Sequence, residues 1–185
     1  MGSNTKPLVA ILMGSDSDLP TMSETGKMLD RFGVSYTMRI TSAHRSPGKT
    51  HELVKTMDEQ GVQVFVVGAG LAAHLAGVVA SLTAKPVIGV PMGGGSLQGV
   101  DALYSTVQMP GGVPVATMAI GRHGAKNAGV FAAQILALKD DELRDRLAAF
   151  KTELERSVED KDDKLTSELK DASEAIAELT RGGDR

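Results

Sequence analysis

The sequence contains no cysteine. Disulfides, thiolate nucleophiles and cysteine-based metal sites are therefore excluded. Tryptophan is also absent and aromatic residues make up only 3% of the chain, so the core has to be built mainly from Val, Ile, Leu, Met and Ala. An HExxH motif and clustered carboxylates are missing too, and we therefore expect no metal site.

A block of basic residues is missing as well. The net charge is −3, which argues against a nucleic-acid partner because phosphate backbones require concentrated Lys and Arg. No apolar run approaches the length of a membrane span, and residues 1–7 lack the apolar segment of a signal peptide. We expect a soluble, cytoplasmic protein without a membrane partner, whose residues 1–7 are disordered or tag-like.

Short apolar runs, separated by glycines, dominate the first three quarters of the chain. Hydrophobic residues make up 42% of the sequence, and many of its 21 glycines lie between these runs. Runs of this length that end at glycine are typical of strands buried on both faces of a parallel sheet. The predicted strands are residues 8–13, 35–40, 63–67, 86–91 and 115–120, and the predicted helices end near 32, 60, 83, 107 and 138. This alternation predicts an α/β domain over residues 8–139.

The loops that follow these strands form a candidate site. Right-handed crossovers make all the strands parallel, so the loops after them emerge at one edge of the sheet. We therefore expect residues 15–18, 42–45 and 68–74 to converge, although they lie far apart in the sequence.

Residues 140–185 differ in kind from the rest. Apolar residues recur at helical spacing with charges between them, which predicts amphipathic helices. We expect two helices with a break near residues 160–163. The first stripe contains Leu143, Leu147, Phe150, Leu154 and Val158, and the second contains Leu165, Leu169, Ala172, Ile176 and Leu179. Their mixed polar face favours packing against the domain or a neighbouring subunit over a membrane surface.

The loop at residues 41–47 (TSAHRSP) pairs a titratable imidazole with a fixed cation. Histidine can exchange protons near neutrality, and the guanidinium of Arg45 suits a phosphate or carboxylate. The alternative is a surface loop that carries His44 and Arg45 without a function. Convergence with the other strand-end loops favours a site, with His44 as the candidate for proton transfer.

Residues 14–18 (GSDSD) either cap a helix or seat an anion. Backbone amides at a helix N-terminus attract phosphate, and serine hydroxyls can complete the seat. Residues 68–70 (GAG) lack the third glycine of the dinucleotide fingerprint, which disfavours NAD. His74, about one turn into the next predicted helix, is either a ligand-facing or a surface residue. The GxSxG elbow of hydrolases is absent.

Four ordered motifs resemble the PurE family, the N5-carboxyaminoimidazole ribonucleotide mutases (class I) of de novo purine biosynthesis. They are residues 13–18 (MGSDSD), 42–47 (SAHRSP), 68–70 (GAG) with 73–75 (AHL), and 108–114 (QMPGGVP). The resemblance implies a flavodoxin-like three-layer α/β/α sandwich with a parallel five-stranded sheet, assembled as a homo-octamer with sites at subunit junctions. It implies conversion of N5-carboxyaminoimidazole ribonucleotide to 4-carboxy-5-aminoimidazole ribonucleotide by decarboxylation, CO2 trapping and recarboxylation at carbon 4, without a cofactor.

The resemblance also implies roles for single residues. His44 would be the general acid/base, and every other carried-over residue would bind the substrate. Ser15, Ser42 and Arg45 would hold the 5′-phosphate, Asp18 the ribose hydroxyls, and Ser17, Ala69, Gly70 and Leu75 the migrating carboxylate and the ring, with Ala43 and His74 beside them.

Two positions depart from the family pattern, and two other functions stay open. The family usually has Gly at Leu71 and Pro at Ala76. One alternative is the second PurE class, which carboxylates aminoimidazole ribonucleotide directly with CO2; Arg45 and His74 favour the mutase. The other is a non-catalytic nucleotide-binding module on the same fold.

Overall fold

The computed structural model describes the backbone of residues 6–182 and the side chains of residues 6–173. The chain divides into two compact units, the first ending at Arg144 and the second beginning at Asp145. The expectation for the first five residues lies outside the described residues, as does that for the side chains of Ile176 and Leu179.

The first unit is built on a sheet of five parallel strands in the order β2-β1-β3-β4-β5. This is the flavodoxin-like order, so the predicted fold class is confirmed. The strands are β1 (Val9–Met13), β2 (Tyr36–Ile40), β3 (Val64–Ala69), β4 (Val87–Pro91) and β5 (Ala116–Thr117). Every residue of β1, β3 and β4 is buried, as their continuous apolar sequences predict.

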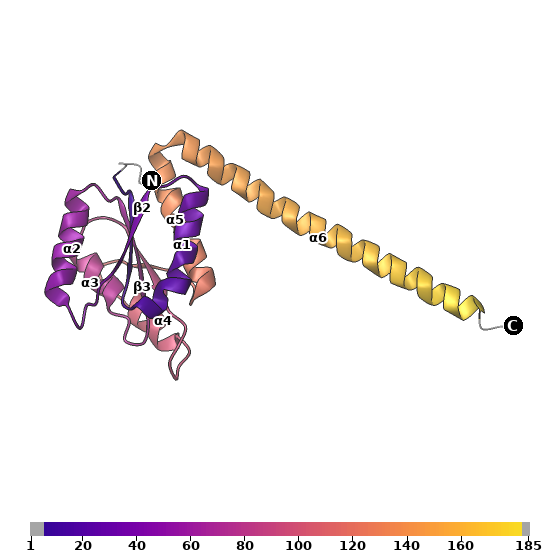
Figure 1. The fold of residues 1–185 in the computed structure, drawn as a ribbon, viewed down its shortest axis with the longest axis horizontal. Helices are drawn as coiled ribbons and strands as arrows, with labels where there is room; N and C mark the ends of the chain where they lie inside the picture. Colours follow the sequence, from indigo (N-terminus) through magenta and orange to yellow (C-terminus); the bar gives the residue numbers. More distant parts are fainter. Residues whose placement is uncertain (1–5, 183–185) are drawn as a thin grey trace. The chain divides into compact units, whose positions relative to one another are not determined.

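Helices cover both faces of this sheet, with α2 and α3 on one side and α1 and α5 on the other (Figure 1). The helices of this unit are α1 (Leu19–Arg31), α2 (Pro47–Glu59), α3 (Leu75–Leu82), α4 (Val100–Val107) and α5 (Arg122–Leu136). Short 3-10 turns at Asp16–Asp18 and Ala137–Lys139 precede α1 and follow α5.

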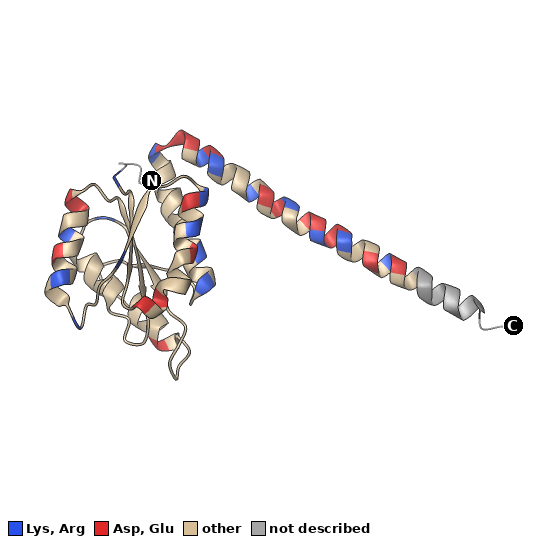
Figure 2. Ribbon diagram, viewed as in Figure 1, with Lys and Arg blue, Asp and Glu red and all other residues tan. Residues whose placement is uncertain are grey.

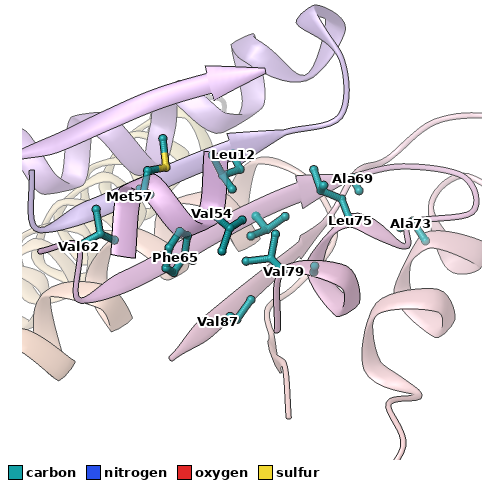
Figure 3. Packing of buried hydrophobic residues seen from close by; sticks show 14 residues of the cluster. Leu12, Val54, Met57, Val62, Phe65, Ala69, Ala73, Leu75, Val79 and Val87 are labelled. Carbon is teal, nitrogen blue, oxygen red and sulfur yellow. The ribbon is translucent and has the colours of Figure 1, made fainter. Parts of the chain in front are cut away.

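The core between the sheet and α2 and α3 is almost purely aliphatic. Leu12 and Phe65 project from the sheet toward Val54 of α2 and Val79 of α3, and all four are fully buried (Figure 3). Burial of side chains of this size stabilises a fold by roughly 1.5–3 kcal/mol each. The face rests on branched aliphatic residues, as the scarcity of aromatics predicts.

On the opposite face, α1 and α5 pack closely because of one glycine. A Cβ atom at Gly129 of α5 would lie 2.8 Å from the Cβ of Met28 and 2.8 Å from the carbonyl oxygen of Thr25, both in α1. The hydroxyl of Thr25 is fully buried and donates a 2.7 Å hydrogen bond to the carbonyl of Ala125. These contacts fix α1, and with it the loop that enters α1 from β1.

Two strand predictions were wrong in extent. The fifth strand, predicted over residues 115–120, contains only Ala116–Thr117. Pro114 has no N–H to donate to a ladder, and Gly121, at φ +74°, turns the chain at the other end. The third strand continues through Gly68 to Ala69, because Gly68 pairs with both Met13 and Val90.

The predicted pair of C-terminal helices was also wrong. A single helix, α6, runs from Asp141 to Gly182 without a break. The charged residues 160–164 include neither Gly nor Pro, so an exposed helix can pass through them. Lys164 forms an ion pair with Glu168 one turn later, at 3.8 Å, which supports the helix there.

Candidate active site

The loops that follow β1, β2, β3 and β4 open into one cavity of about 540 Å³. They reach it from the carboxyl edge of the sheet, beside the β1/β3 switch point where flavodoxin-like proteins bind ligands. The lining residues are Gly14, Ser15, Ser17, Asp18, Ser42, Ala43, His44, Arg45, Ala69, Gly70, Leu71, Ala72, His74, Leu75, Met92, Gly93, Gly94 and Gly95. The volume lies within the ordinary range for small-molecule sites.

Every residue to which the resemblance assigned a role lines this cavity. The predicted convergence of three loops is therefore confirmed, whereas the role of each residue stays a prediction. Sequence reasoning did not count Leu71, Met92 or residues 93–95 as site residues. The available signal was the position of residues 92–95 directly after the fourth strand, since all strand ends share one edge.

Hydrogen bonds within the loop after β1 order its two serines. The Oγ of Ser15 accepts hydrogen bonds from the backbone N–H of Ser17, at 3.3 Å, and from the Ser17 hydroxyl, at 3.0 Å. Ser15 in turn donates to the carboxylate of Asp16, at 3.0 Å. Asp16 is exposed and does not line the cavity, so the loop turns one of its two carboxylates away.

Asp18 is the carboxylate that faces the cavity. Burial raises the pKa of Asp18 above its ordinary value, hydrogen bonding to the Ser15 backbone opposes the rise, and the charge of Asp16 adds to it. A partly buried carboxylate of this kind accepts hydrogen bonds from sugar hydroxyls, because these replace the water it has lost.

The loop after β2 is anchored to the start of α2. Thr41 and Thr50 are buried, and a 2.7 Å hydrogen bond joins their hydroxyls. The Ser46 hydroxyl donates to the carbonyl of Ser42, at 3.2 Å, and the Ser42 hydroxyl accepts from the backbone N–H of Arg45, at 3.2 Å. Because α2 begins at Pro47 as predicted, this network holds the residues between it and β2 in one conformation.

Arg45 links two of the converging loops. Its Nη2 donates a 3.1 Å hydrogen bond to the carbonyl oxygen of Gly14, the first residue of the loop after β1. The guanidinium therefore lies at the end of the cavity that Ser15 also occupies. The remaining N–H groups of the guanidinium, together with the hydroxyls of Ser15 and Ser42, suit a dianionic phosphate.

His44 and His74 form a direct pair. The Nε2 of His44 lies 2.7 Å from the Nδ1 of His74, and the rings meet edge to face with centroids 4.8 Å apart. One nitrogen donates and the other accepts, so the pair shares one proton along this bond. Both side chains line the cavity, which places a shared proton where a bound molecule can reach it.

The sequence predicted that His74 lies about one turn inside the helix after β3. In the structure it lies before α3. It is the N-cap residue of a helix that begins at Leu75. Leu71, at φ +54°, has a left-handed backbone conformation that a right-handed helix cannot include, so the helix starts later. The shift leaves the His74 ring free to meet His44.

Leu71 is one of two non-glycine residues with positive φ in the described chain. The conformation is the one that glycine adopts without strain, which explains why it suits a position that is usually glycine in the resembled family. The Leu71 side chain is 60% exposed and packs on Gly95, where a Cβ atom would lie 2.6 Å from Leu71 Cδ2. Leu71 thus joins the third loop to the glycine-rich loop after β4.

The described residues contain neither a cluster of metal ligands nor a membrane-spanning helix. Among these residues, no group of three or more His, Asp and Glu side chains could hold a metal ion. None of the helices over the same residues is long and apolar enough to cross a membrane.

A parallel α/β unit whose cavity joins a fixed guanidinium to a hydrogen-bonded pair of imidazoles has the features of an enzyme. It can bind a small phosphorylated molecule at one end and exchange a proton with it at the other. These features define a class of enzyme and not yet a reaction.

Comparison with known proteins narrows the class. The family model described as AIR carboxylase matches residues 8–157, and the chain therefore belongs to this family. It is 50% identical over 160 residues to a protein of Pyrococcus horikoshii named N5-carboxyaminoimidazole ribonucleotide mutase, a match that covers 86% of this chain and 89% of that protein. A Thermotoga maritima protein of the same name is 50% identical over 159 residues, covering 86% of this chain and 92% of the relative.

Solved structures agree with the assignment. Treponema denticola PurE superposes with a TM-score of 0.79 at 31% identity, covering 86% of this chain and 98% of the other. A variant of Treponema denticola PurE2 gives a TM-score of 0.80 at 30% identity, covering 87% of this chain and 99% of the other. The family resemblance stated from the four motifs is therefore confirmed.

Proposed function

We infer that this protein is an N5-carboxyaminoimidazole ribonucleotide mutase, an isomerase of de novo purine biosynthesis. It moves the carboxyl group of N5-carboxyaminoimidazole ribonucleotide from nitrogen to carbon 4 of the ring. The observation that carries this inference is one cavity that combines the His44–His74 pair with the Arg45 and serine end, in a chain half identical to relatives that bear the name.

The substrate lies, in our proposal, with its 5′-phosphate at the Arg45 end. Ser15, Ser42 and the guanidinium contact the phosphate, and Asp18 accepts hydrogen bonds from the ribose hydroxyls. The Arg45–Gly14 hydrogen bond supports this orientation because it fixes the guanidinium beside the Ser15 loop. A charged anchor at one end holds the ring at a set distance from the imidazoles.

The small residues at the other end suit a flat ring. Ala69 and Gly70 line the cavity where β3 ends. With side chains no larger than a methyl group, these two residues let the aminoimidazole ring lie against the backbone. We assign Ser17, Ala69, Gly70 and Leu75 to the seat of the ring and the migrating carboxylate, and Ala43 to the wall beside His44.

The proposed reaction balances without an external proton or cofactor. The bond between the exocyclic amino nitrogen and the carboxyl carbon of the carbamate breaks and releases CO2, and this nitrogen takes a proton. Carbon 4 then attacks the trapped CO2, and its own proton leaves to a base. We propose that His44 donates the first proton and removes the second, so the enzyme returns to its initial state.

The neighbouring imidazole supports this use of His44. Because His44 Nε2 and His74 Nδ1 are 2.7 Å apart, a proton that one ring gives up can be replaced along their hydrogen bond. A cavity that excludes water is also required, because released CO2 would otherwise escape before carbon 4 attacks it.

Assembly into a homo-octamer in the cytoplasm remains part of the proposal. Helix α4 exposes Val100, Tyr104 and Val107, which are 45%, 60% and 47% exposed. Neighbouring exposed apolar residues of this kind mark an interaction site, and a second copy of the chain suits this face. Sedimentation of the full chain measures the number of subunits.

Retention of the migrating carbon distinguishes this function from direct carboxylation. Purified protein receives N5-carboxyaminoimidazole ribonucleotide labelled with carbon-13 in its carboxyl group, in buffer with unlabelled bicarbonate and no ATP. We expect the label in the carboxyl group at carbon 4. An unlabelled product, or product formed only from aminoimidazole ribonucleotide and CO2, would support the second PurE class. If no product forms from either substrate, the result would support a non-catalytic nucleotide-binding module.

A further inference from the structure

Helix α6 carries an exposed apolar stripe. Leu154, Val158, Leu165 and Leu169, here called the tail stripe, are 49%, 66%, 53% and 63% exposed. All described side chains from Lys151 to Ser173 are exposed. Four large apolar residues on one face of a long helix are a surface for association.

The spacing of the tail stripe keeps it on one face. Leu165 follows Leu154 by eleven residues and Leu169 follows Val158 by the same step. An eleven-residue repeat corresponds to about 3.67 residues per turn, close to the 3.6 of a straight helix. The tail stripe therefore faces one direction along a nearly straight α6. A second helix can contact it from Leu154 to Leu169.

The tail stripe is symmetric about a point between Lys161 and Asp162. Val158 and Leu165 lie at equal distances on either side of this point, and so do Leu154 and Leu169. In an antiparallel pair of α6 helices centred there, Val158 is level with Leu165 of the second copy and Leu154 with Leu169. Each apolar residue of the stripe then meets an apolar residue.

The charges at the centre favour the same arrangement. Lys161 interrupts the stripe, three residues after Val158 and four before Leu165, so it points to the same face. In a parallel pair in register, Lys161 would face its own copy and repel it. In the antiparallel pair, each Lys161 is level with Asp162 of the other chain, and the two contacts attract.

The remaining surface of α6 agrees with a second copy as the occupant. Acidic and basic side chains are interspersed along the helix (Figure 2), so opposite charges are available to pair between two copies, and no basic face suits a lipid surface. The AIR carboxylase match ends at residue 157, so most of the stripe lies beyond the region that the family shares.

We propose that the tail stripe is a self-association surface on which α6 pairs in antiparallel orientation with α6 of a second copy of this chain. The centre of the pair lies between Lys161 and Asp162. The pairing does not depend on the catalytic activity inferred above, since it uses no residue of the cavity.

Cysteine crosslinking of the full chain tests this register, because the wild-type sequence has no cysteine to give a background. In V158C/L165C, each introduced thiol is level with one of the second copy, and we expect most chains to form a covalent dimer under mild oxidation. In L165C alone, the two thiols are about 10 Å apart along the axis, at 1.5 Å per residue. This exceeds the reach of a disulfide, and we expect monomers on a denaturing gel.

Two controls make the result decisive. T152C/K170C places its two thiols at nearly equal distances on either side of the centre but on the opposite face of α6, and we expect no more crosslinking than in L165C. In the V158C/L165C background, K161D should lower the yield and K161D/D162K should restore it, because the exchange recreates two attractive contacts.

Several outcomes would overturn the proposal. Crosslinking of L165C alone would show a parallel pair. A yield from V158C/L165C no higher than from T152C/K170C would show that the stripe has no second copy upon it. Failure of K161D/D162K to recover the yield would show that the central register is wrong. Turnover of each variant, compared with wild type, checks that the first unit is intact.

Discussion

The two units of this chain use apolar residues in opposite ways. In the unit that ends at Arg144, the strands β1, β3 and β4 are buried along their whole length. In the unit that begins at Asp145, Leu154, Val158, Leu165 and Leu169 are about half exposed or more. The first unit buries its apolar strands in a core, whereas the second leaves its apolar stripe exposed. The difference suggests a division in which the proposed chemistry belongs to the first unit and the second adds an association surface.

Loss of the proposed acid/base should give the largest effect. For His44→Asn we expect turnover to fall about 100- to 10,000-fold, the usual contribution of a positioned acid/base, while the Kd for the ribonucleotide changes little. His51→Asn is the matched control, since His51 lies on α2 outside the cavity and should behave as wild type. Near-normal turnover of His44→Asn would assign proton transfer to another group.

Removal of the guanidinium should weaken binding more than it slows chemistry. For Arg45→Ala we expect a Kd about 10- to 100-fold higher, from the roughly 1.5–3 kcal/mol that a hydrogen bond to a charged group contributes. The loss should shrink as salt concentration rises. Arg39→Ala, at an exposed end of β2, serves as the control. An unchanged Kd at low salt would contradict the phosphate assignment.

A methyl group between α1 and α5 should destabilise the first unit. Gly129→Ala forces a Cβ atom to within 2.8 Å of Met28 and Thr25, and overpacking of this kind costs about 1–3 kcal/mol. Gly48→Ala in α2 is the matched control, because a Cβ atom there meets nothing within 4 Å. Denaturant unfolding measures both. Equal stability of the two variants would mean that α1 and α5 move apart at little cost.

The carboxyl group of Asp18 should make a small, pH-dependent contribution to stability. Burial raises its pKa in the folded protein, so the stability it contributes is complete at acid pH and is lost as the pH rises through the raised pKa. The Asp18→Asn side chain stays neutral at every pH. The stability of this variant relative to wild type should therefore be higher at pH 7 than at pH 3. Asp145→Asn, at an exposed position, should show no such difference. A gain independent of pH would exclude the ionised carboxyl as its source.

Truncation of the second unit should have the smallest effect on chemistry. Removal of residues 160–185 deletes half of the tail stripe and no residue of the cavity. We expect kcat/KM for the mutase reaction to remain that of the full chain. A large fall would show that the tail supports the active site and would weaken the separation of the two units.

Much of the first unit could be predicted from the sequence because its signals are local. Continuous apolar runs mark strands buried on both faces, and β1 and β4 begin and end within a residue of their predictions. The four-motif resemblance identified the family for the same reason, since a motif is a property of neighbouring residues. Signals of this kind can be interpreted without knowing the tertiary contacts.

The failures occurred where a neighbour in space decides the outcome. The length of β5 depends on pairing with β4, and β3 continues through Gly68 because two strands flank it. The break predicted in α6 rested on a run of charges, which an exposed helix accommodates. The position of His74 depends on the left-handed backbone at Leu71, a conformation that no sequence rule assigns to leucine.

The sequence by itself determined the order of strands and helices in the first unit, the family, and the three loops that meet at the candidate site. Hydrophobic period, glycine and proline act within a few residues, and this makes them readable in a linear chain. Only the tertiary structure decided that His44 and His74 share a hydrogen bond and that Arg45 reaches Gly14. These contacts join residues about thirty positions apart, and the parallel sheet brings them together by placing every strand end at one edge.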